Sequence, residues 1–313
     1  MSGKLALGID IGGTNVKLAL VNEAGEVIAS ESVPTEPERG AEAFCREVAA
    51  TAKKMTAQAG IAWAEVIGVG VGMAAFLDVE RGWIEESVNL HWRDVPLGEM
   101  LTRELGKPVR VDNDANVAAL GEVWLGAGRN ANTALCVTLG TGVGGGIVIN
   151  GRIHRGVTNM AGEIGHIMVK NDGELCNCGH HGCLETLASA TALSRHAEQA
   201  GLVGKEGREL TSKEIFEMAE AGNAKAKAVV DDMIHWLAVG LSIGANILNP
   251  DVIVIAGGVV NAGDALIEPL RKAFHREALA RVARACTIVP AKLGSQAGVL
   301  GAARLVLQEI ETV

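Results

Sequence analysis

Two glycine-rich bends, each joining a pair of apolar strands, constrain this 313-residue chain more than any other feature of its sequence. The first pair spans residues 4–21 and bends at Gly12-Gly13-Thr14-Asn15, and the second spans residues 134–149 and bends at 140–146. Such apolar runs predict β-strands, and glycine permits the tight connection between them. Gly12 and Gly142 lie 130 residues apart (142 − 12), close to half the chain. The repeat therefore predicts two related α/β domains that face each other across a cleft.

The other sequence patterns complete this α/β fold. Helical spacing and N-cap residues predict helices over residues 40–58, 97–105, 115–125, 223–248 and 296–310, and apolar runs predict strands over 26–33, 66–71, 109–111 and 251–256. No Ser/Pro-rich linker or charge block separates the halves. We therefore expect an N-terminal α/β domain over residues 1–130 that continues directly into a C-terminal α/β domain over residues 131–313.

The composition disfavours several classes of partner. Lys plus Arg minus Asp plus Glu gives 28 − 37 = −9, whereas nucleic acids and anionic membranes bind basic surfaces. Tyrosine is absent, and 5 Trp and 4 Phe are too few for a base-stacking surface. The start of the chain shows no secretory signal pattern, and the apolar run 237–248 is too short to cross a bilayer. With six cysteines that suggest no disulfide framework, we expect a cytoplasmic protein that binds small molecules rather than nucleic acid or membrane.

The first bend, Asp10-Ile11-Gly12-Gly13-Thr14, has the composition of an anion site. Glycines after a strand let successive backbone N–H groups converge on one anion, and Thr14 adds a hydroxyl donor. Asp10, at the end of the strand, could hold a magnesium ion through water. An ordinary glycine hairpin is the alternative interpretation. The second bend favours the anion site, because two bends in related domains could hold one polyphosphate from both sides.

A second motif combines His166, Cys176, Cys178 and Cys183 in the spacing His-x9-Cys-x-Cys-x4-Cys. Three thiolates and one imidazole form a closed tetrahedral zinc site without an open catalytic position. We therefore expect a structural zinc in loop 166–183, and three reduced cysteines in a loop are the alternative. Because two further histidines, at 180 and 181, lie inside the knuckle, the spacing alone leaves the histidine ligand open.

The third motif, Asn113-Asp114-Ala115-Asn116, places an amide beside a carboxylate. These groups offer hydrogen-bond donors and acceptors to the vicinal hydroxyls of a sugar. Asp114 also precedes an apolar helix, where aspartate is commonly a plain N-cap. The pattern alone does not decide between a sugar-facing carboxylate and a helix cap.

Together these motifs resemble those of the ROK family of bacterial sugar kinases and repressors, in the hexokinase–actin superfamily, and most closely those of its glucokinases. Residues 10–14 and 139–146 resemble the two phosphate motifs of that superfamily, and residues 253–259 resemble its adenosine motif. Residues 162–166 resemble the ROK pattern Gly-Glu-x-Gly-His, which favours His166 as the zinc ligand. The resemblance covers essentially the whole chain. It implies two related actin-like (ribonuclease H-like) domains with a cleft between them and a zinc-knuckle insertion.

The resemblance also implies an activity, which is ATP-dependent phosphorylation of glucose at its 6-hydroxyl with Asp114 as the general base. It implies ATP, Mg²⁺ and a structural Zn²⁺ as cofactors, and a homodimer as the assembly. The implied nucleotide and magnesium site consists of Asp10, Gly12, Gly13, Thr14, Thr141, Gly142, Gly257 and Gly258. The implied sugar site consists of Asn89, Asn113, Asp114, Glu163, His166 and Glu185.

Two positions depart from the family pattern. Ala74-Ala75 stand where family members usually have Pro-Gly or Gly-Gly, which leaves the approach of this backbone to a sugar hydroxyl open. Ala161 replaces the first glycine of a Gly-Gly-Glu pattern. The alternatives within the family are a kinase for N-acetylmannosamine, N-acetylglucosamine, mannose or fructose, polyphosphate as the donor, and a non-catalytic sugar sensor. A ROK repressor is disfavoured, because the first strand begins by residue 5 and leaves no room for a preceding helix-turn-helix.

Overall fold

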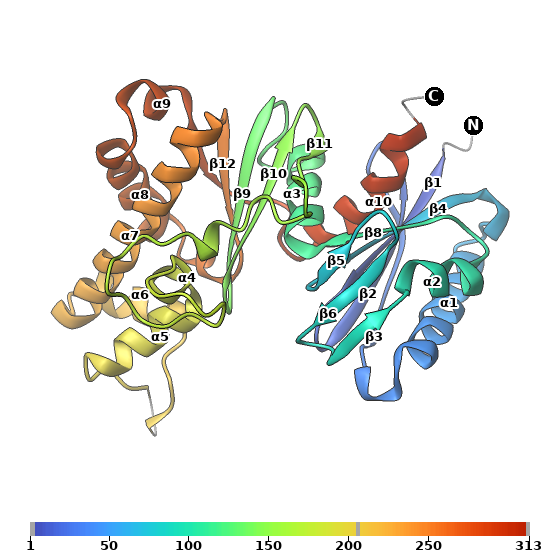
Figure 1. Ribbon diagram of the computed structural model, residues 1–313, viewed down its shortest axis with the longest axis horizontal. Helices are drawn as coiled ribbons and strands as arrows, with labels where there is room; N and C mark the ends of the chain where they lie inside the picture. Colours follow the sequence, from blue (N-terminus) through green and yellow to red (C-terminus); the bar gives the residue numbers. More distant parts are fainter. Residues whose placement is uncertain (1–3, 205–206, 311–313) are drawn as a thin grey trace. The chain divides into compact units, whose positions relative to one another are not determined.

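The structure of the protein is a computed structural model that describes residues 4–204 and 207–310. The chain divides into two compact units (Figure 1). Unit 1 consists of the chain up to Arg129, of Arg152–Ala161 and of the chain from Ser295 onward, and unit 2 consists of Asn130–Gly151 and Gly162–Gly294. Each unit is described below by itself.

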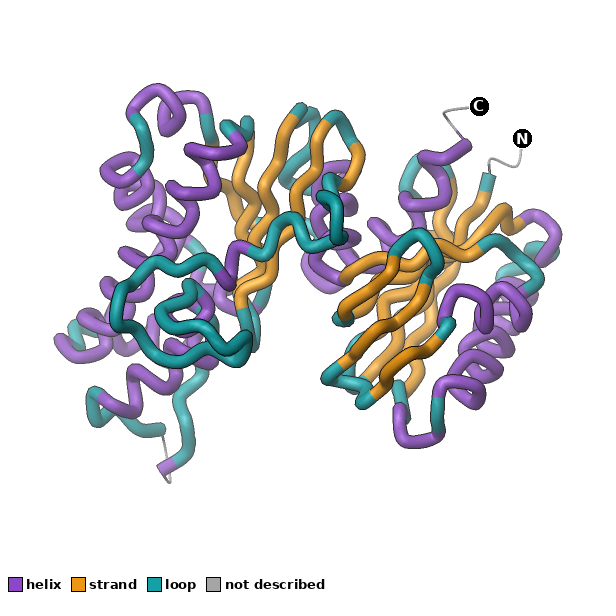
Figure 2. The backbone as a smooth tube through the Cα atoms, viewed as in Figure 1, coloured by secondary structure: helices purple, strands orange, loops and turns teal. Residues whose placement is uncertain are grey.

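Unit 1 is built on a five-stranded mixed sheet with the strand order β3-β2-β1-β4-β8 (Figure 2). Its strands are β1 (Leu5–Ile11), β2 (Asn15–Asn22), β3 (Val27–Pro34), β4 (Val66–Met73) and β8 (Val109–Asn113). The first three pair antiparallel, whereas β4 runs parallel to β1 and β8 parallel to β4. All residues of β1 except Asp10 are buried, as expected of a central strand that is covered on both faces. A small antiparallel sheet follows, formed by β5 (Phe76–Asp78), β6 (Trp83–Ser87) and β7 (Trp92–Val95).

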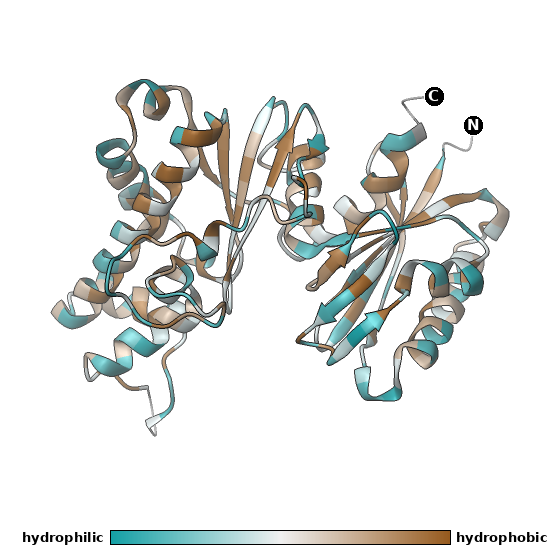
Figure 3. Ribbon diagram, viewed as in Figure 1, coloured by the Kyte–Doolittle hydropathy of each residue, from teal (hydrophilic) through white to brown (hydrophobic). Residues whose placement is uncertain are grey.

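The helices of unit 1 cover these sheets. They are α1 (Ala41–Gln58), α2 (Leu97–Leu105), α3 (Asp114–Leu125) and α10 (Ala297–Ile310), with the 3₁₀ turns η1 (Pro37–Arg39), η2 (Trp63–Glu65) and η6 (Gly294–Gln296) nearby. The apolar stripe of α1 places Phe44 and Val48 in the same buried cluster as the β1 side chains. Phe44 also meets Trp92 of β7 edge to face, with ring centroids 5.2 Å apart. In Figure 3 the central strand β1 is coloured mainly as hydrophobic, in line with its burial.

The last helix, α10, packs directly on the backbone of β1, β4 and α3. A Cβ atom at Gly8 would lie 1.9 Å from the Val299 carbonyl oxygen, and one at Gly70 would lie 1.7 Å from the Ala302 carbonyl oxygen. On the helix itself, a Cβ at Gly301 would lie 1.6 Å from the carbonyl oxygen of Val117 in α3. Only glycine allows backbones to approach this closely, so these positions fix where α10 lies on the sheet.

Unit 2 repeats the strand arrangement of unit 1. Its sheet contains the strand order β10-β9-β12-β13, with β9 (Thr133–Leu139), β10 (Val143–Ile149), β12 (Val252–Ala256) and β13 (Thr287–Pro290). The two-residue strand β11 (Arg152–Ile153) falls in the Arg152–Ala161 segment of unit 1. The central strand β9 pairs antiparallel with its hairpin partner β10 and parallel with β12, as β1 does with β2 and β4. The α/β fold of two related halves that the sequence repeat predicts is confirmed.

The helices of unit 2 surround a long central helix, α7 (Ala224–Leu248). The others are α4 (Glu185–Ala188), α5 (Ala190–Gln199), α6 (Ser212–Glu220), α8 (Asp264–Glu277) and α9 (Ala280–Ala285), with the 3₁₀ turns η3 (Ile164–His166) and η5 (Gly258–Ala262). Asn223 caps the start of α7 by accepting hydrogen bonds from the Lys225 and Ala226 amides, and Asn249 ends it in the left-handed conformation. By length and composition α7 could cross a membrane, but it packs against α6 and α8 as the core helix of a unit does.

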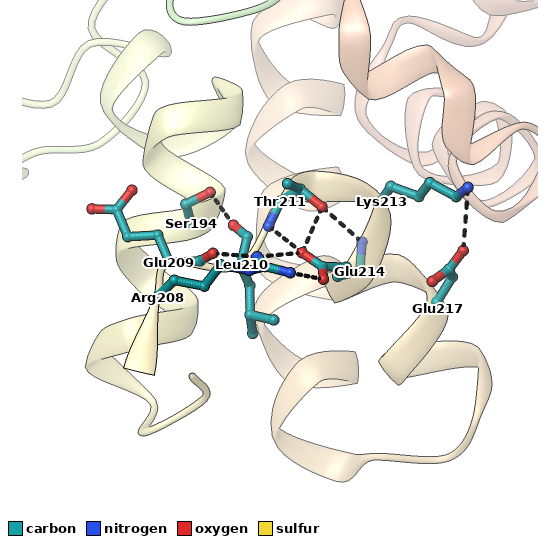
Figure 4. A network of polar contacts seen from close by, with 8 residues as sticks. All are labelled: Ser194, Arg208, Glu209, Leu210, Thr211, Lys213, Glu214 and Glu217. Carbon is teal, nitrogen blue, oxygen red and sulfur yellow. Dashed lines mark hydrogen bonds and ion pairs between the residues drawn. The ribbon is translucent and has the colours of Figure 1, made fainter. Parts of the chain in front are cut away.

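A network of polar contacts fixes the start of α6 (Figure 4). Thr211 and Glu214 form a capping box, and Arg208 pairs with the Glu214 carboxylate. The hydrogen bond from Arg208 is the main reason that the pKa of Glu214 falls to about 2. The Ser194 hydroxyl donates to the Leu210 carbonyl oxygen at 2.7 Å, which ties the same segment to α5. This network connects two helices of unit 2.

The observed units differ from the expected domains in one respect. The sequence predicts that everything after residue 130 forms one domain, whereas the chain from Ser295 onward, with α10, and Arg152–Ala161 belong to unit 1. The physical reason for α10 is the close backbone packing at Gly8 and Gly70, which periodicity does not reveal. The sequence analysis also missed the small β5–β7 sheet and the helices α5, α6, α8 and α9.

We predict that Gly70→Ala lowers the free energy of unfolding by about 1–3 kcal/mol or more, because the added methyl group overlaps the Ala302 carbonyl oxygen. Denaturant unfolding of the purified variant measures this loss. Gly13→Ala is the matched control, since its Cβ would find no atom nearer than 3.9 Å. Equal stability of the two variants would contradict the packing of α10 described above.

Candidate functional site

The first glycine bend, Gly12–Thr14, is exposed, and its neighbours fix its shape. The Gly12 amide donates to the Asn15 carbonyl oxygen at 3.0 Å. Buried Thr35 donates twice to the bend, from its hydroxyl to the Gly12 carbonyl oxygen at 2.7 Å and from its amide to the Thr14 carbonyl oxygen at 2.9 Å. Because both carbonyl oxygens are engaged with Thr35, the bend is held in one conformation. Such a fixed bend can present N–H groups to an anion.

Asp10 precedes this bend on β1 and lies opposite Lys17 in the pairing with β2. The first turn of α10 packs against it, since a Cβ at Gly298 would lie 2.7 Å from the Asp10 carboxyl group. Burial raises the pKa of Asp10, the Lys17 ammonium group lowers it, and the Asp114 carboxylate raises it. Asp10 and Asp114 are therefore close enough to interact electrostatically. A pair of neighbouring carboxylates favours a cation between or beside them.

Asp114 is the first residue of α3, and the N-cap of that helix is Asn113. The Asn113 side-chain oxygen accepts a hydrogen bond from the Ala115 amide at 2.9 Å, and Asp114 Oδ1 accepts from the same amide at 2.9 Å. The interpretation of Asp114 as the N-cap is therefore wrong. Although the Asp114 side chain is accessible to solvent, its crowded surroundings desolvate the carboxylate and raise its pKa, an effect that the Ala115 hydrogen bond opposes.

Asn89 lies beside the first bend, because a Cβ at Gly13 would be 3.9 Å from the Asn89 Cβ. It follows β6, whose last residue, Ser87, is buried and donates its hydroxyl to the Ala74 carbonyl oxygen at 3.0 Å. That bond fixes the turn at Ala74-Ala75 between β4 and β5. Within unit 1 the structure thus brings Asn89 to the bend and Asp114 to Asp10.

The second glycine bend, between β9 and β10, encloses the carboxylate of Glu185. The Val143 amide donates to Glu185 Oε2 at 3.0 Å, and a Cβ at Gly142 would lie 2.2 Å from the same oxygen. A side chain at position 142 would therefore displace the Glu185 carboxylate from the Val143 amide, a contact that the sequence analysis did not foresee. Thr141 is exposed in the same bend.

Gly257 and Gly258 follow β12 and adjoin the end of β9. Gly257 has φ 90°, and a Cβ there would lie 2.2 Å from the Leu139 carbonyl oxygen. Gly258 starts η5, and a Cβ there would meet no atom within 4 Å. Within unit 2, Gly257 therefore lies against the residue that precedes the second bend, and Gly258 leaves open space beside it.

His166, Cys176, Cys178 and Cys183 form one cluster in unit 2, with their ligand atoms all within 4.8 Å of one another. Cys176 Sγ lies 3.6 Å from His166 Nδ1, and Cys178 Sγ lies 3.6 Å from Cys183 Sγ. Donors about 2.3 Å from a tetrahedral zinc lie about 3.7 Å from each other, so the spacing and the donor set both fit this metal. His180 Nδ1 approaches Cys178 alone, at 3.6 Å, and His181 bonds to the Gly173 carbonyl oxygen. Of the three candidate histidines, the described structure places His166 in the cluster.

The cluster is connected to two carboxylates of the proposed sugar site. His166 turns Nδ1 toward Cys176 and has Nε2 4.0 Å from Glu163 Oε2. Glu185 Oε1 lies 3.9 Å from Cys176 Sγ. Unit 2 therefore brings Glu163, His166, Glu185 and Gly142 into one neighbourhood, with the cluster behind them. A metal bound at Nδ1 would fix the orientation of the imidazole and hence of Nε2.

The thiols of the cluster differ in acidity. Hydrogen bonds from the backbone N–H and the side chain of His180 lower the pKa of Cys178 to about 6, whereas burial raises the pKa of Cys183 to about 12. Burial also raises the pKa of Cys176. A metal that binds here must displace protons from the two buried thiols, so its affinity falls as the pH falls.

The sequence analysis missed Lys17 and Gly298, which both surround Asp10. Lys17 Nζ also donates to the Ser295 carbonyl oxygen at 3.2 Å, which connects β2 to the segment before α10. The hairpin register could have revealed Lys17, because Asp10 and Lys17 are equidistant from the centre of the first bend. Only the tertiary packing of α10 reveals Gly298.

These features define a class of protein. Two related α/β units each present a glycine bend, one adds a carboxylate at the start of a helix, and the other adds a Cys₃His cluster. Glycine bends that can bind phosphate groups, together with a carboxylate that can accept a proton, are typical of a phosphotransferase, here one built of two related α/β halves.

The family follows from comparison with known proteins. The model of the ROK family matches residues 6–309, and the chain belongs to this family. It is 43% identical over 319 residues to a glucokinase from Halalkalibacterium halodurans, which covers 99% of this chain and 97% of that protein. A ROK hexokinase from Thermus thermophilus superposes with a TM-score of 0.88 at 33% identity and covers 99% of this chain and 100% of that one. A ROK family glucokinase from Streptomyces griseus, solved with glucose and AMPPNP, superposes with a TM-score of 0.78 at 36% identity. The match covers 97% of this chain and 99% of that one.

We predict that Gly142→Ala destabilises the protein by about 1–3 kcal/mol, because the methyl group displaces the Glu185 carboxylate from the Val143 amide. In a protein that already carries Glu185→Ala, Gly142→Ala should lower the free energy of unfolding much less, because the Glu185 carboxylate that the methyl group would meet is absent. Denaturant unfolding of the two single variants and the double variant gives the coupling. Gly140→Ala, whose Cβ would meet no atom within 4 Å, is the control. Additive effects of the two substitutions would contradict the contact.

Proposed function

We propose that the protein is an ATP-dependent glucokinase, which transfers the γ-phosphoryl group of ATP to the 6-hydroxyl of glucose. The observation that carries this proposal is the placement of Asp114, whose capping function is taken over by Asn113 and whose pKa is raised. The similarity over nearly the full chain to a glucokinase, and to a ROK glucokinase solved with glucose and AMPPNP, supports glucose and ATP as the substrates.

Asp114 acts as the general base in this proposal. Its carboxylate accepts the proton of the 6-hydroxyl as the oxygen attacks the γ-phosphorus and the bond to the ADP oxygen breaks. A raised pKa makes the carboxylate a stronger base, provided that the working pH stays above it. Because the Ala115 amide binds Oδ1, Asp114 is held in orientation while Oδ2 is available to the sugar.

The nucleotide is assigned to the two glycine bends and to Gly257 and Gly258. The bend Gly12–Thr14, which Thr35 holds rigid, and the bend with Thr141 and Gly142 offer N–H groups to the phosphates. The open space at Gly258 suits a flat adenosine group. Asp10 suits a magnesium ion, because it is a half-buried carboxylate that interacts with a second carboxylate, Asp114. When bound, such an ion neutralises phosphate charge.

The sugar is assigned to Asn89, Asn113, Asp114, Glu163, His166 and Glu185. Carboxylate oxygens accept hydrogen bonds from hydroxyls, and the two asparagine amides both donate and accept. His166 offers Nε2 to the sugar while the Cys₃His cluster holds Nδ1. We assign zinc to this cluster, and its contribution is structural, because four protein ligands leave no open position.

Another hexose is the second candidate substrate, and one observation favours it. The turn Ala74-Ala75 is fixed by Ser87 and carries two methyl groups where family members usually have glycine. These groups alter how the backbone can approach a sugar hydroxyl, and a site that hydrogen-bonds a hydroxyl discriminates strongly between analogues. We further propose a homodimer, as the resemblance to the family implies, and a cytoplasmic location, in line with six cysteines that form no disulfide.

We expect the purified protein to release ADP with glucose and ATP, and kcat/KM to be highest for glucose in a panel with mannose, fructose, N-acetylmannosamine and N-acetylglucosamine. Asp114→Asn should lower kcat by about 100-fold or more, because the near-isosteric amide cannot accept the proton. A coupled ADP assay, with polyphosphate compared as the donor, measures both. A higher kcat/KM for another sugar of the panel would replace glucose as the proposed substrate. A kcat of Asp114→Asn equal to that of the wild type would show that Asp114 is not the general base.

We expect about one zinc per chain, and we expect Cys178→Ser to lose it, because three donors no longer close the tetrahedron. Chelators should remove the metal more readily as the pH falls, since the buried thiols of Cys176 and Cys183 have raised pKa values and reclaim protons first. Elemental analysis measures the content. Cys286→Ala, a buried thiol outside the cluster, is the control and should retain the metal. Wild-type metal content in Cys178→Ser would contradict this ligand set.

A further inference from the structure

We propose that Arg155 is a positioning residue for the general base Asp114 and that it acts through the buried carboxylate of Asp112. This inference rests on the proposed function. Asp112 lies on β8, two residues before Asp114, and its side chain is 0% exposed. Arg155 lies in the segment that follows β11, and both residues belong to unit 1. Neither residue is among those predicted from the sequence motifs.

The carboxylate of Asp112 accepts three hydrogen bonds and forms an ion pair. Oδ2 accepts one hydrogen bond from Arg155 Nε at 2.7 Å, and a terminal guanidinium nitrogen of the same side chain lies 2.6 Å from it in the ion pair. Oδ1 accepts one from the Asn113 amide at 2.8 Å and one from Asn116 Nδ2 at 2.9 Å. A carboxylate this deeply buried stays ionised only if its charge is compensated, and the guanidinium group of Arg155 supplies that compensation.

These bonds join the strand and the helix that flank Asp114. The Asn113 amide belongs to the end of β8, and Asn116 belongs to the first turn of α3. Asp112 therefore connects the end of β8 to the first turn of α3. Asp114 lies between Asn113 and Asn116, the two residues that Asp112 binds. The Asn116 side-chain oxygen is buried and has no hydrogen-bond partner among the described residues, so the bond to Asp112 alone sets the orientation of this amide.

Arg155 is itself held in place by its own loop. The Ala161 amide donates to the Arg155 carbonyl oxygen at 3.0 Å, and Asn159 Nδ2 lies 3.5 Å from the Leu77 carbonyl oxygen. The Arg155 side chain remains 31% exposed, whereas its partner is fully buried. The guanidinium group therefore lies between the Asp112 carboxylate and solvent. Without it, the buried carboxylate would lack a compensating charge, and β8 and α3 would shift as it moved toward water.

A shift of β8 and α3 would change the distance between the Asp114 carboxylate and the proton that it accepts. A general base must lie within hydrogen-bonding reach of the proton that it accepts, and a displacement of about 1 Å can cost about 100-fold in rate. Asp112 and Arg155 do not need to touch either substrate to produce this effect. Their loss should therefore lower kcat by a larger factor than it weakens the binding of either substrate.

The test compares Arg155→Met, Arg155→Lys and Arg110→Met with the wild-type protein. Arg110 is the matched control, because it lies on the same strand β8 and forms an ion pair with Glu309 at 2.7 Å, with both side chains about half exposed. We expect Arg155→Met to lower kcat about 10- to 100-fold, while the dissociation constants of glucose and of AMPPNP, from calorimetry, change less than about 3-fold. Arg155→Lys should restore part of kcat, and Arg110→Met should match the wild type.

The outcomes separate a positioning role from a structural one. Calorimetric binding stoichiometry gives the fraction of folded, binding-competent protein, and kcat is corrected by it. A corrected kcat of Arg155→Met equal to that of the wild type overturns the inference, as does a loss of glucose affinity as large as the loss of kcat. Arg155→Lys no better than Arg155→Met also overturns it, because compensation by a cation would then be irrelevant. A wild-type protein that phosphorylates no sugar instead overturns the proposed function, and this inference falls with it.

Discussion

Direct contact between backbones at glycine positions is the constraint on which the rest of the structure depends. α10 lies on β1 and β4 only because Gly8 and Gly70 have no side chain, and its first turn reaches Asp10 only because position 298 is also glycine. The same device operates in unit 2, where Gly142 makes room for the Glu185 carboxylate. Each of these contacts brings a backbone or a carboxylate to a place that any larger residue would fill. The high glycine content of the chain is therefore a set of packing requirements as well as a set of turns.

The carboxylates in and beside the proposed site differ in how far neighbouring protein groups compensate their negative charge, and this difference matches their proposed roles. Asp112 is fully buried and paired with a guanidinium group, which suits a fixed structural anion. Asp10 and Asp114 have raised pKa values because desolvation disfavours the charge of both, and the Asp114 carboxylate adds repulsion at Asp10. Charges that are only partly compensated by the protein attract a cation or a proton from outside, as a magnesium ligand and a general base must. Glu185 is intermediate, since one oxygen already accepts the Val143 amide.

Sequence reasoning was most successful where a local pattern carries the information. The two bends, the strands beside them and the helix over residues 115–125 follow from periodicity and turn chemistry, and the cysteine spacing identified three of the four clustered ligands. It failed where tertiary contact decides. Neither α10 in unit 1 nor the Asp112–Arg155 pair can be read from spacing, because the partners are far apart in the chain. The sequence left open whether Asp114 caps α3, since Asn113 and Asp114 are both good N-cap residues and only backbone geometry identifies Asn113 as the cap.

The Cys₃His cluster and the Asp112–Arg155 pair represent two solutions to one problem. In both, a reactive side chain must keep its orientation, and polar groups beside it hold the segment that carries it. In unit 2, His166 and Glu185 lie next to a set of donors that a metal would hold together. In unit 1, Asp114 lies between two positions that a buried ion pair holds together. An apolar pair in place of a buried ion pair often costs a protein no stability, but an apolar pair here could not bind the Asn113 amide and the Asn116 side chain at once. The value of the ion pair is therefore geometric, because directional bonds fix an orientation that packing alone leaves free.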